Sequence, residues 1–191
     1  MNLQFLLSCF YFFLPAYLTN MTPPLMRRFE ILKCLDKPVD FGKNFRGEPF
    51  LGSHKTWRGV VGGILVGILT VLLQARLYQF PFIKEISFLN YREINILLFG
   101  FLISGGAVFG DLFFAFIKRR LKLPSGAPFL PFDQTNYVLG TALFLTPYLL
   151  TCPSPVISWW RVWFTLFILT FFLHAVFNRL GYELGLNKAK W

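Results

Sequence analysis

Two carboxylates stand close in the sequence to a run of three cations. Asp111 follows Gly110 inside a long apolar segment, and the run Lys118-Arg119-Arg120 ends that segment. A second acid, Asp133, follows after a short connection. An acid inside an apolar helix is costly, so by default it marks a functional site that holds a cationic partner. Two carboxylates beside three cations suit a bound divalent metal ion and a polyphosphate.

Simpler interpretations exist for parts of this cluster. The basic run is typical of a cytoplasmic flank that stops a membrane helix from sliding. Asp133 can cap the helix that follows it, and Thr135 and Asn136 are candidates for the same cap. Neither role requires an acid two turns inside the apolar helix, at Asp111. The functional interpretation is therefore needed for Asp111 even where the others have alternatives.

The spacing of the cluster predicts how it holds a ligand. Asp111 and Lys118 are seven residues apart, so on a straight helix they lie on nearly one face, about 10 Å apart along the axis. They cannot form a close ion pair, but they can bind successive parts of one elongated ligand. The connection before Asp133 contains three prolines and a glycine, which can fold back toward Asp111. Mg²⁺ prefers oxygen ligands, so Asp111 and Asp133 are the predicted metal ligands.

The whole chain is predicted to be an all-α integral membrane protein. Its 191 residues are 55% hydrophobic and 19% aromatic, with a mean hydropathy of +0.54. Apolar stretches long enough to cross a bilayer predict five transmembrane helices in one membrane domain, residues 1–191. The predicted spans are 3–18, 60–78, 94–117, 137–157 and 159–180.

The basic residues predict the orientation of these spans. Fifteen of the 19 Lys and Arg residues fall in the connections 20–58 and 118–136, at the end of the last span (Arg179) or in the tail after it. Basic residues are held on the cytoplasmic side, so the N-terminus is predicted outside and the C-terminus inside. The protein is therefore expected to be a multi-pass protein of the cytoplasmic membrane, with one large cytoplasmic loop between helices 1 and 2 and its site at the cytoplasmic face.

The net charge of +10 does not indicate nucleic-acid binding. The basic residues lie in loops between membrane spans, where anionic lipid headgroups of the bilayer or an anionic substrate are the expected partners. The sequence carries no signal for the oligomeric state.

The first loop, residues 20–58, has the composition of a phosphate-binding segment. It ends in Gly52-Ser53-His54-Lys55-Thr56-Trp57-Arg58-Gly59, where glycines allow close backbone approach and Lys, Arg and Thr can bind phosphate oxygens. A Walker A motif is excluded, because Ser53-His54 stand where that motif needs a glycine directly before the lysine. A solvated basic loop is the alternative. The candidate substrate-binding residues in this loop are Asn20, Asp40, His54, Lys55, Thr56, Trp57 and Arg58. Asn20 has the alternative of simply ending the first helix.

Several of these segments together resemble the CDP-archaeol synthase family, membrane relatives of the phosphatidate cytidylyltransferases. The resemblance rests on Gly52 to Gly59, Gly110-Asp111, Phe116 to Arg120 and Asp133-Gln134. It extends to Asn20 with the prolines after it, to Pro38 through Gly42, and in the tail to His174, Asn178, Gly181-Tyr182, Leu184 through Leu186 and Trp191. One departure is Asn136, where the family usually has a second acid, so this position brings an amide oxygen but no charge.

The resemblance implies an Mg²⁺-dependent transfer of CMP from CTP to a membrane lipid phosphate, with release of pyrophosphate. The acceptor is expected to be 2,3-bis-O-geranylgeranylglycerol 1-phosphate or a phosphatidate-like lipid. Asp111, Lys118, Arg119 and Asp133 are then the catalytic residues, and Asp111 and Asp133 also hold the metal. Arg120, Gln134 and Asn136 join the loop residues as substrate-binding candidates.

Other functions and one further motif were considered. A small transporter of anions or lipids, and a non-catalytic membrane assembly protein, are the alternatives to the enzyme. A CDP-alcohol phosphatidyltransferase is excluded, because its Asp-x-x-Asp-Gly-x-x-Ala-Arg motif does not occur. In the last span Thr170, His174, Asn178 and Tyr182 recur at every fourth residue. Such a stripe indicates interhelical hydrogen bonds, with a catalytic role for His174 as the alternative.

Overall fold

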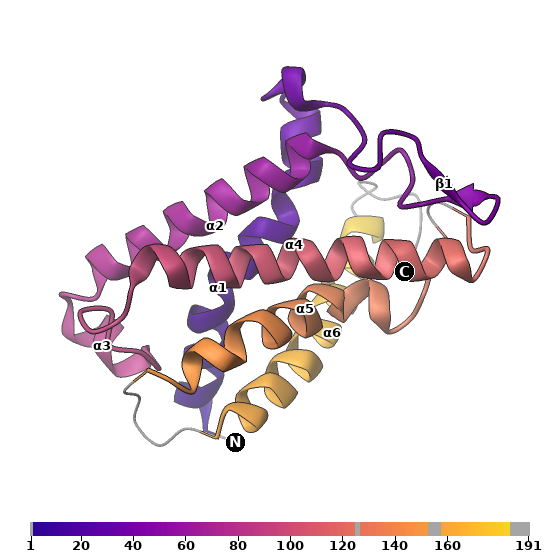
Figure 1. The fold of residues 1–191 in the computed structure, drawn as a ribbon. Coiled ribbons are helices and arrows are strands. Elements are labelled where there is room, and N and C mark those ends of the chain that lie inside the picture. Colours follow the sequence, from indigo (N-terminus) through magenta and orange to yellow (C-terminus); the bar gives the residue numbers. More distant parts are fainter. Residues whose placement is uncertain (1, 125–126, 153–157, 184–191) are drawn as a thin grey trace.

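Long helices make up most of the fold. The computed structural model describes residues 2–124, 127–152 and 158–183. Its long helices are α1 (Leu3–Arg28), α2 (Trp57–Leu77), α4 (Ile96–Arg120), α5 (Phe132–Leu149) and α6 (Trp159–Glu183) (Figure 1). The shorter elements are the 3-10 helix η1 (Lys33–Leu35), the helix α3 (Pro81–Ile86) and the strands β1 (Asn44–Phe45) and β2 (Glu48–Pro49). The all-α prediction therefore holds apart from one small hairpin.

Four of the described helices are long and apolar enough to cross a membrane. These are α1, α2, α4 and residues 159–176 of α6. The helix α5 is not among them, because its first turns carry the polar residues Asp133 through Asn136 within only 18 residues. The chain is thus a membrane protein, whereas the count of five spans and their orientation remain predictions.

The first helix is longer than its predicted span. We expected it to end near residue 18 and the large loop to begin at Asn20, but α1 continues to Arg28 through Pro23 and Pro24. The last turns of α1 pack against the glycine-rich face of α2, where Pro23 lies directly over Gly59. This close packing stabilises a helical end that two prolines would otherwise break.

The predicted loop 118–136 is also wrong in its second half. The helix α4 runs to Arg120, and α5 already begins at Phe132 rather than near residue 137 and ends at Leu149 rather than near residue 157. Asp133 through Asn136 are therefore on a helix. Packing against α4 stabilises the polar first turns of this helix. The Asp133 side chain thus projects from a helix and not from a loop.

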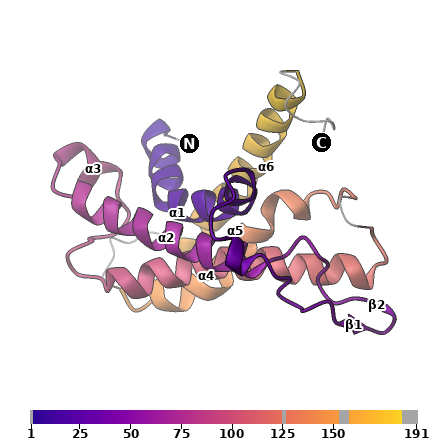
Figure 2. The same ribbon diagram turned by 90° about the horizontal axis from the view of Figure 1, so that it is seen from above.

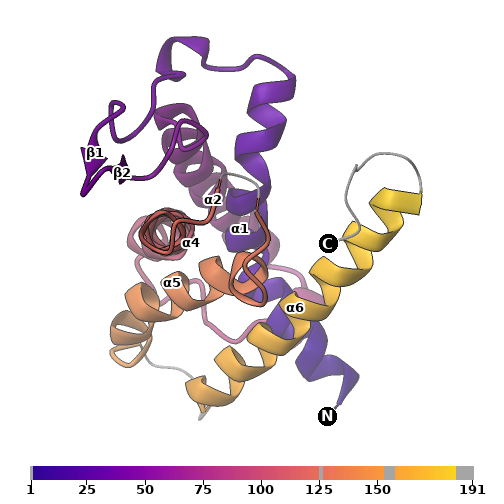
Figure 3. The ribbon, with the colours of Figure 1, turned by 90° about the vertical axis from the view of Figure 1, so that its right-hand side faces the viewer.

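The helices α4 and α5 are in closer contact than any other pair. Small residues allow this approach: a Cβ added at Gly110 would overlap the Asn136 carbonyl, and one added at Gly140 would overlap the backbone of α4 at Gly106. Figure 3, which looks along α4, shows α5 beside it on one side and α1 and α2 on the other. The buried core between the helices is largely aromatic and aliphatic, with Phe12, Phe99 and Leu145 among its fully buried residues.

The first loop is an ordered structure of its own. It carries η1 and the antiparallel pair of β1 with β2, in which Asn44 pairs with Pro49. Figure 2 shows this hairpin at the opposite end of the molecule from α3. The hairpin turn uses Arg46 and Gly47 with positive φ, as a tight two-residue turn requires. The loop lies at the same end of the molecule as the C-terminal end of α4, where the basic run is found.

Candidate active site

Two neighbouring cavities lie between the first loop and the helices α1, α2, α4 and α5. The larger, about 150 Å³, is between the loop, α4 and the start of α5. It is lined by Leu51, Gly52, His54, Lys55, Asp111, Ala115, Lys118, Arg119, Asp133 and Asn136. The smaller, about 60 Å³, is lined by residues of α1, α2 and α4 that include Thr19, Asn20, Thr56, Gly59 and Val108. Both cavities share His54, Lys55 and Asp111. The fold thus brings together both predicted metal ligands and most of the predicted cations.

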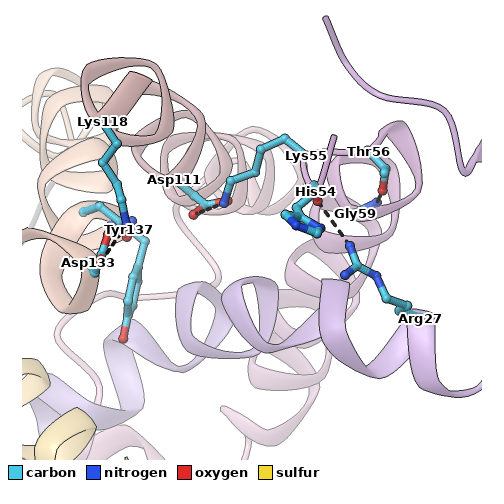
Figure 4. Close-up of polar contacts among 10 residues, drawn as sticks. Arg27, His54, Lys55, Thr56, Gly59, Asp111, Lys118, Asp133 and Tyr137 are labelled. Carbon is cyan, nitrogen blue, oxygen red and sulfur yellow. Dashed lines mark hydrogen bonds and ion pairs between the residues drawn. The ribbon is translucent and has the colours of Figure 1, made fainter. Parts of the chain in front are cut away.

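Asp111 is paired with Lys55, a residue 56 positions earlier in the chain. The Lys55 Nζ donates to both carboxylate oxygens of Asp111, each at 2.7 Å (Figure 4). Both side chains are partly exposed, with 28% of Lys55 and 30% of Asp111 accessible to solvent. The costly acid in the apolar helix therefore has the cationic partner that its position predicts.

Asp133 is paired with Lys118 across the contact between α5 and α4. The Lys118 Nζ donates to Asp133 Oδ1 at 3.0 Å and to Oδ2 at 2.9 Å, and also to the Ala127 carbonyl at 2.6 Å. The Asp133 carboxylate further accepts a bond of 2.9 Å from the Phe129 N–H. Because Asp133 is the second residue of α5 rather than its N-cap, capping does not account for its position. Asp111 and Lys118 do not pair with each other, as their spacing predicts.

Arg119 presents a guanidinium to the larger cavity. The side chain is buried, with 9% of the residue exposed, and its Nε atom has no hydrogen-bond partner among the described residues. A buried charge without a hydrogen-bonded partner is strongly unfavourable unless a ligand provides one. Arg119 is therefore suited to bind an anion in the cavity.

The two amides after Asp133 differ in their surroundings. The Asn136 side chain lines the larger cavity, and its Oδ1 accepts a 2.6 Å bond from the Tyr137 N–H. Gln134 is buried, and its Oε1 has no hydrogen-bond partner in the described part of the chain. Asn136 thus contributes its amide to the wall of the larger cavity.

Residues at the start of α2 are divided between the cavities and the surface. Thr56 is the N-cap of α2, its hydroxyl accepting from the Gly59 N–H at 3.5 Å, and it lines the smaller cavity with Asn20. His54 lines both cavities, while its carbonyl accepts a 3.3 Å bond from Arg27. Trp57 is partly exposed as the first residue of α2. Asn20 is within α1, so it does not end that helix.

Three predicted substrate-binding residues lie away from both cavities and hold the loop instead. The Asp40 carboxylate accepts from the backbone N–H groups of Gly42, Leu51 and Gly52 at 3.0, 2.8 and 3.0 Å. Arg58 is buried, pairs with Asp36 and donates to a carbonyl of α1. Their polar atoms stabilise the loop backbone, and this structural use was not expected from the sequence.

Arg120 is the third of these residues. Its guanidinium donates to the carbonyls of Phe45, Glu48 and Pro49, so it fastens the hairpin to the end of α4. It also lies 5.1 Å from the ring centres of both Phe45 and Phe116. Cation–π contacts of this kind add to the hydrogen bonds.

The polar stripe of the last helix is only partly described. The Thr170 hydroxyl bonds to the Tyr17 hydroxyl at 2.8 Å, which is the interhelical hydrogen bond that the stripe predicts. His174 is half-buried on α6. The side chains of Asn178 and Tyr182, and the tail from residue 184, lie outside the described residues.

The residues present fit a bound Mg²⁺ ion. Among the described residues there is no cluster of three or more His, Cys, Asp and Glu side chains. Mg²⁺ does not require one, because it is usually held by one or two carboxylates together with waters and substrate phosphates. Asp111 and Asp133 supply two carboxylates to one cavity, and each already binds a cation, the ammonium of a lysine. The donor set therefore suits a metal that arrives with a phosphate ligand.

Two contributions to the site were not anticipated from the sequence. The Ala127 carbonyl holds Lys118, and Thr19 lines the smaller cavity. A backbone carbonyl carries no signal in its residue type. Thr19 directly precedes the candidate residue Asn20, and both lie on α1 because that helix continues beyond residue 18. A prediction that extended the helix this far would have placed Thr19 beside the site.

Comparisons with known proteins show the family of this chain. A family model described as CarS-like CDP-archaeol synthase matches residues 2–191. The chain belongs to the CDP-archaeol synthase family. The CDP-archaeol synthase of Pyrococcus horikoshii is 33% identical over 193 residues, covering all of both chains, and that of Archaeoglobus fulgidus is 34% identical over 193 residues, covering 99% of each.

A solved structure shows the same fold. The structure of an intramembrane enzyme for archaeal membrane lipids biosynthesis aligns with a TM-score of 0.59 at 24% identity, covering 88% of this chain and 91% of that chain. Membership of the CDP-archaeol synthase family confirms the resemblance drawn from the sequence motifs. It also confirms the predicted enzyme class, CTP:lipid-phosphate cytidylyltransferase.

Proposed function

We propose that this member of the CDP-archaeol synthase family transfers CMP from CTP to 2,3-bis-O-geranylgeranylglycerol 1-phosphate at the cytoplasmic face of the membrane, in an Mg²⁺-dependent reaction. The observation that carries the proposal is the larger cavity. It brings two carboxylates from different helices together with Lys55, Lys118 and Arg119. The similarity of the chain to archaeal CDP-archaeol synthases supports the ether lipid, and not a phosphatidate-like lipid, as the proposed acceptor.

In the proposed reaction an oxygen of the lipid phosphate attacks the α-phosphorus of CTP. The new P–O bond forms while the bond between the α-phosphorus and the bridging oxygen breaks, and pyrophosphate leaves. The nucleophile is already anionic at neutral pH, so no side chain has to remove a proton. The protein must supply position and neutralise charge, as in other phosphoryl transfers.

The side chains of the cavity divide this task. Arg119, with no internal hydrogen-bond partner at Nε, binds phosphate oxygens. Lys118 holds the Asp133 carboxylate in place from α4, and Lys55 brings a second ammonium from the first loop. Mg²⁺ held by Asp111 and Asp133 would offset the negative charge that develops on the pyrophosphate.

An aromatic surface formed by α4 and α5 suits the apolar tails of the lipid acceptor. Phe109, Phe113 and Phe144 are partly exposed on α4 and α5, and their rings are in contact, with ring centres 5.7 and 4.9 Å apart. Apolar tails can lie along such a surface while the phosphate reaches the polar end of α4. A transporter would need charged residues along the spans, whereas the charges of the candidate site gather at one end of the helices.

Purified protein, labelled CTP, Mg²⁺ and a panel of lipid phosphates test the proposal. We expect CDP-lipid to form with the ether lipid phosphate and to disappear when the metal is chelated. Absence of CDP-lipid with every acceptor would refute the proposed activity.

Two substitutions test the site. We expect Asp133→Asn and Lys118→Ala each to lower kcat by about a hundredfold or more, equivalent to about 3 kcal/mol, because each removes one of a charge pair that faces the reaction. Lys43→Gln is the matched control, since Lys43 is exposed on the same loop as Lys55 and outside both cavities. Turnover close to that of the unmodified protein in both variants, with folding retained in detergent, would contradict the assignment.

A further inference from the structure

The Lys55–Asp111 ion pair lies on the wall that the two cavities share. Among the described residues three line both cavities, and two of them form this pair. The cavities hold about 150 and 60 Å³. A nucleoside triphosphate that reaches from one cavity into the other must pass the Lys55–Asp111 pair, and it can do so only if the pair separates.

The two cavities have different linings. The larger contains Lys118, Arg119 and Asp133, which suits a polyanion with its metal. The smaller contains uncharged polar groups of Thr19, Asn20 and Thr56 beside aliphatic ones. A ligand with a charged end and an uncharged end fits this arrangement, and the Lys55–Asp111 pair lies between the two ends.

The two lysines of the site are not equally held. The Lys118 ammonium has a third acceptor in the Ala127 carbonyl, is only 11% exposed, and belongs to a helix. The Lys55 ammonium bonds within the described chain only to Asp111, is 28% exposed, and belongs to the segment just before α2. Partly exposed pairs of this kind contribute little stability, so Lys55 is the cation that can leave.

The geometry also makes Lys55 a competitor of a metal ion. Its ammonium is 2.7 Å from each oxygen of Asp111, so it uses both oxygens that a divalent cation would need. An ammonium beside a divalent cation is repelled, whereas the phosphates of a nucleotide offer it a new anionic partner.

We infer that Lys55 exchanges partners during substrate binding: it neutralises Asp111 and excludes free divalent cation, then passes to the phosphates of the nucleotide when metal and nucleotide enter together. The inference deepens the proposed function and rests on it for the identity of the ligand. Its consequence is that the site favours the metal–nucleotide complex over either component alone.

Binding measurements on the purified protein in detergent test this exchange without turnover. Mn²⁺ binding is measured by electron paramagnetic resonance in the absence of nucleotide. Binding of α,β-methylene-CTP, which cannot be cleaved at the α–β bridge, is measured in the presence of saturating Mg²⁺. In Lys55→Gln we expect Mn²⁺ to bind about threefold or more tightly, because the competing pair is lost. We expect the nucleotide analogue to bind about tenfold more weakly, because a charge-assisted contact is lost.

In Lys55→Gln, tighter Mn²⁺ binding together with weaker nucleotide binding distinguishes the exchange from a lysine that only binds phosphate or only holds Asp111 in place. Mn²⁺ binding that is unchanged or weaker in Lys55→Gln would overturn the inference, as would unchanged binding of the nucleotide analogue. Lys43→Gln removes the same charge from the exposed part of the loop and should change neither affinity. Lys55→Met keeps the length and apolar stem of the side chain and gives the same test if the glutamine disturbs the loop.

The result is independent of the proposed activity. If Lys55→Gln binds Mn²⁺ more tightly and the nucleotide more weakly but no acceptor yields CDP-lipid, the exchange stands and the proposed reaction falls. If CDP-lipid forms but Mn²⁺ binding does not tighten, the proposed reaction stands and the exchange falls.

Discussion

At the scale of single residues, three consecutive cations have three different environments. Lys118 bonds to Asp133, Arg119 lines the cavity, and Arg120 bonds to the hairpin carbonyls. Successive residues of a helix point about 100° apart, so neighbours in the sequence face different parts of the fold. A basic run at a helix end is therefore not one functional unit, and its members should respond differently to substitution.

Asp40 should make the order of the loop depend on pH. Burial raises the pKa of its carboxyl. Hydrogen bonds from the backbone N–H groups of Leu51, Gly52 and Gly42 together lower the pKa by more than burial raises it, so the pKa lies below the ordinary value. A carboxyl whose pKa is lower in the folded than in the unfolded protein stabilises the fold at pH values above its unfolded pKa, which is about 3.9. This stabilisation is lost as the pH falls through the pKa of the folded protein. We expect protection of the Leu51 and Gly52 amides from hydrogen exchange, after correction for intrinsic rates, to fall on acidification from about pH 5 to about pH 2.

Asp40→Asn provides the comparison for this measurement. The amide has one oxygen where the carboxylate has two, so protection of these backbone groups should already be low at about pH 5 and should change little on acidification. Equal pH dependence in the unmodified protein and the variant would show that another group controls the order of the loop.

At the scale of elements, the contact of α4 with α5 sets the distance between the two carboxylates. Asp111 directly follows Gly110, and Asp133 is on the turn of α5 before Asn136, whose carbonyl lies against Gly110. Any residue larger than glycine at this contact separates the helices and with them the carboxylates.

Gly110→Ala should therefore destabilise the protein and lower its activity together. Inserting a methyl group into a contact this close costs about 1–3 kcal/mol, and the displaced helices would hold the two proposed metal ligands, Asp111 and Asp133, at the wrong distance. Gly105→Ala is a matched control on the same helix, because a Cβ at Gly105 has nothing within 4 Å. Thermal unfolding in detergent and turnover with CTP measure the two effects; equal behaviour of the two variants would contradict the argument.

Arg120→Ala should release the hairpin from α4. The variant loses three hydrogen bonds and two ring contacts, so trypsin should cleave at the exposed Lys43 and Arg46 faster than in the unmodified protein. Turnover should fall about tenfold or more, because the loop that carries Lys55 is less well positioned. Lys122→Gln removes an exposed charge two residues away and should leave both readouts unchanged. Slow cleavage in Arg120→Ala would show that the hairpin is held by other contacts.

At the scale of the whole molecule, both predicted cytoplasmic connections lie at one end. The first loop and the C-terminal end of α4 contact each other there, while α3 lies at the other end (Figure 2). The basic residues of these connections predict that this end of the molecule faces the cytoplasm. In that orientation the two cavities would lie on the side of the membrane where CTP is available.

The native cysteines can test this orientation. Cys34 is exposed on the first loop, and Cys152 follows α5 near the opposite end. We expect a membrane-impermeant maleimide to label Cys152 but not Cys34 in intact cells, and to label Cys34 in inverted vesicles, as peptide mapping can resolve. Cys9 is buried in α1 and should not react in either case. Labelling of Cys34 in intact cells would mean that the charge-based orientation is wrong.

Much of this architecture follows from local properties of the chain. Hydropathy predicts the apolar helices, because a stretch near 20 residues long is the length that crosses a bilayer. It fails at the C-terminal end of α1 and at the start of α5. There, polar or proline-containing turns stay helical only because α2 and α4 pack against them.

Residue types alone determined that this chain is a membrane protein. They also predict a metal- and phosphate-binding site, because an acid in an apolar helix and clustered cations have few other uses. Tertiary structure alone decided how the charges are shared: Lys55 with Asp111, Lys118 with Asp133, Asp40 and Arg120 with the loop backbone. Residue type determines what a side chain can bind. Which partner it meets depends on distances between segments far apart in the chain, and only the packing of the helices sets those distances.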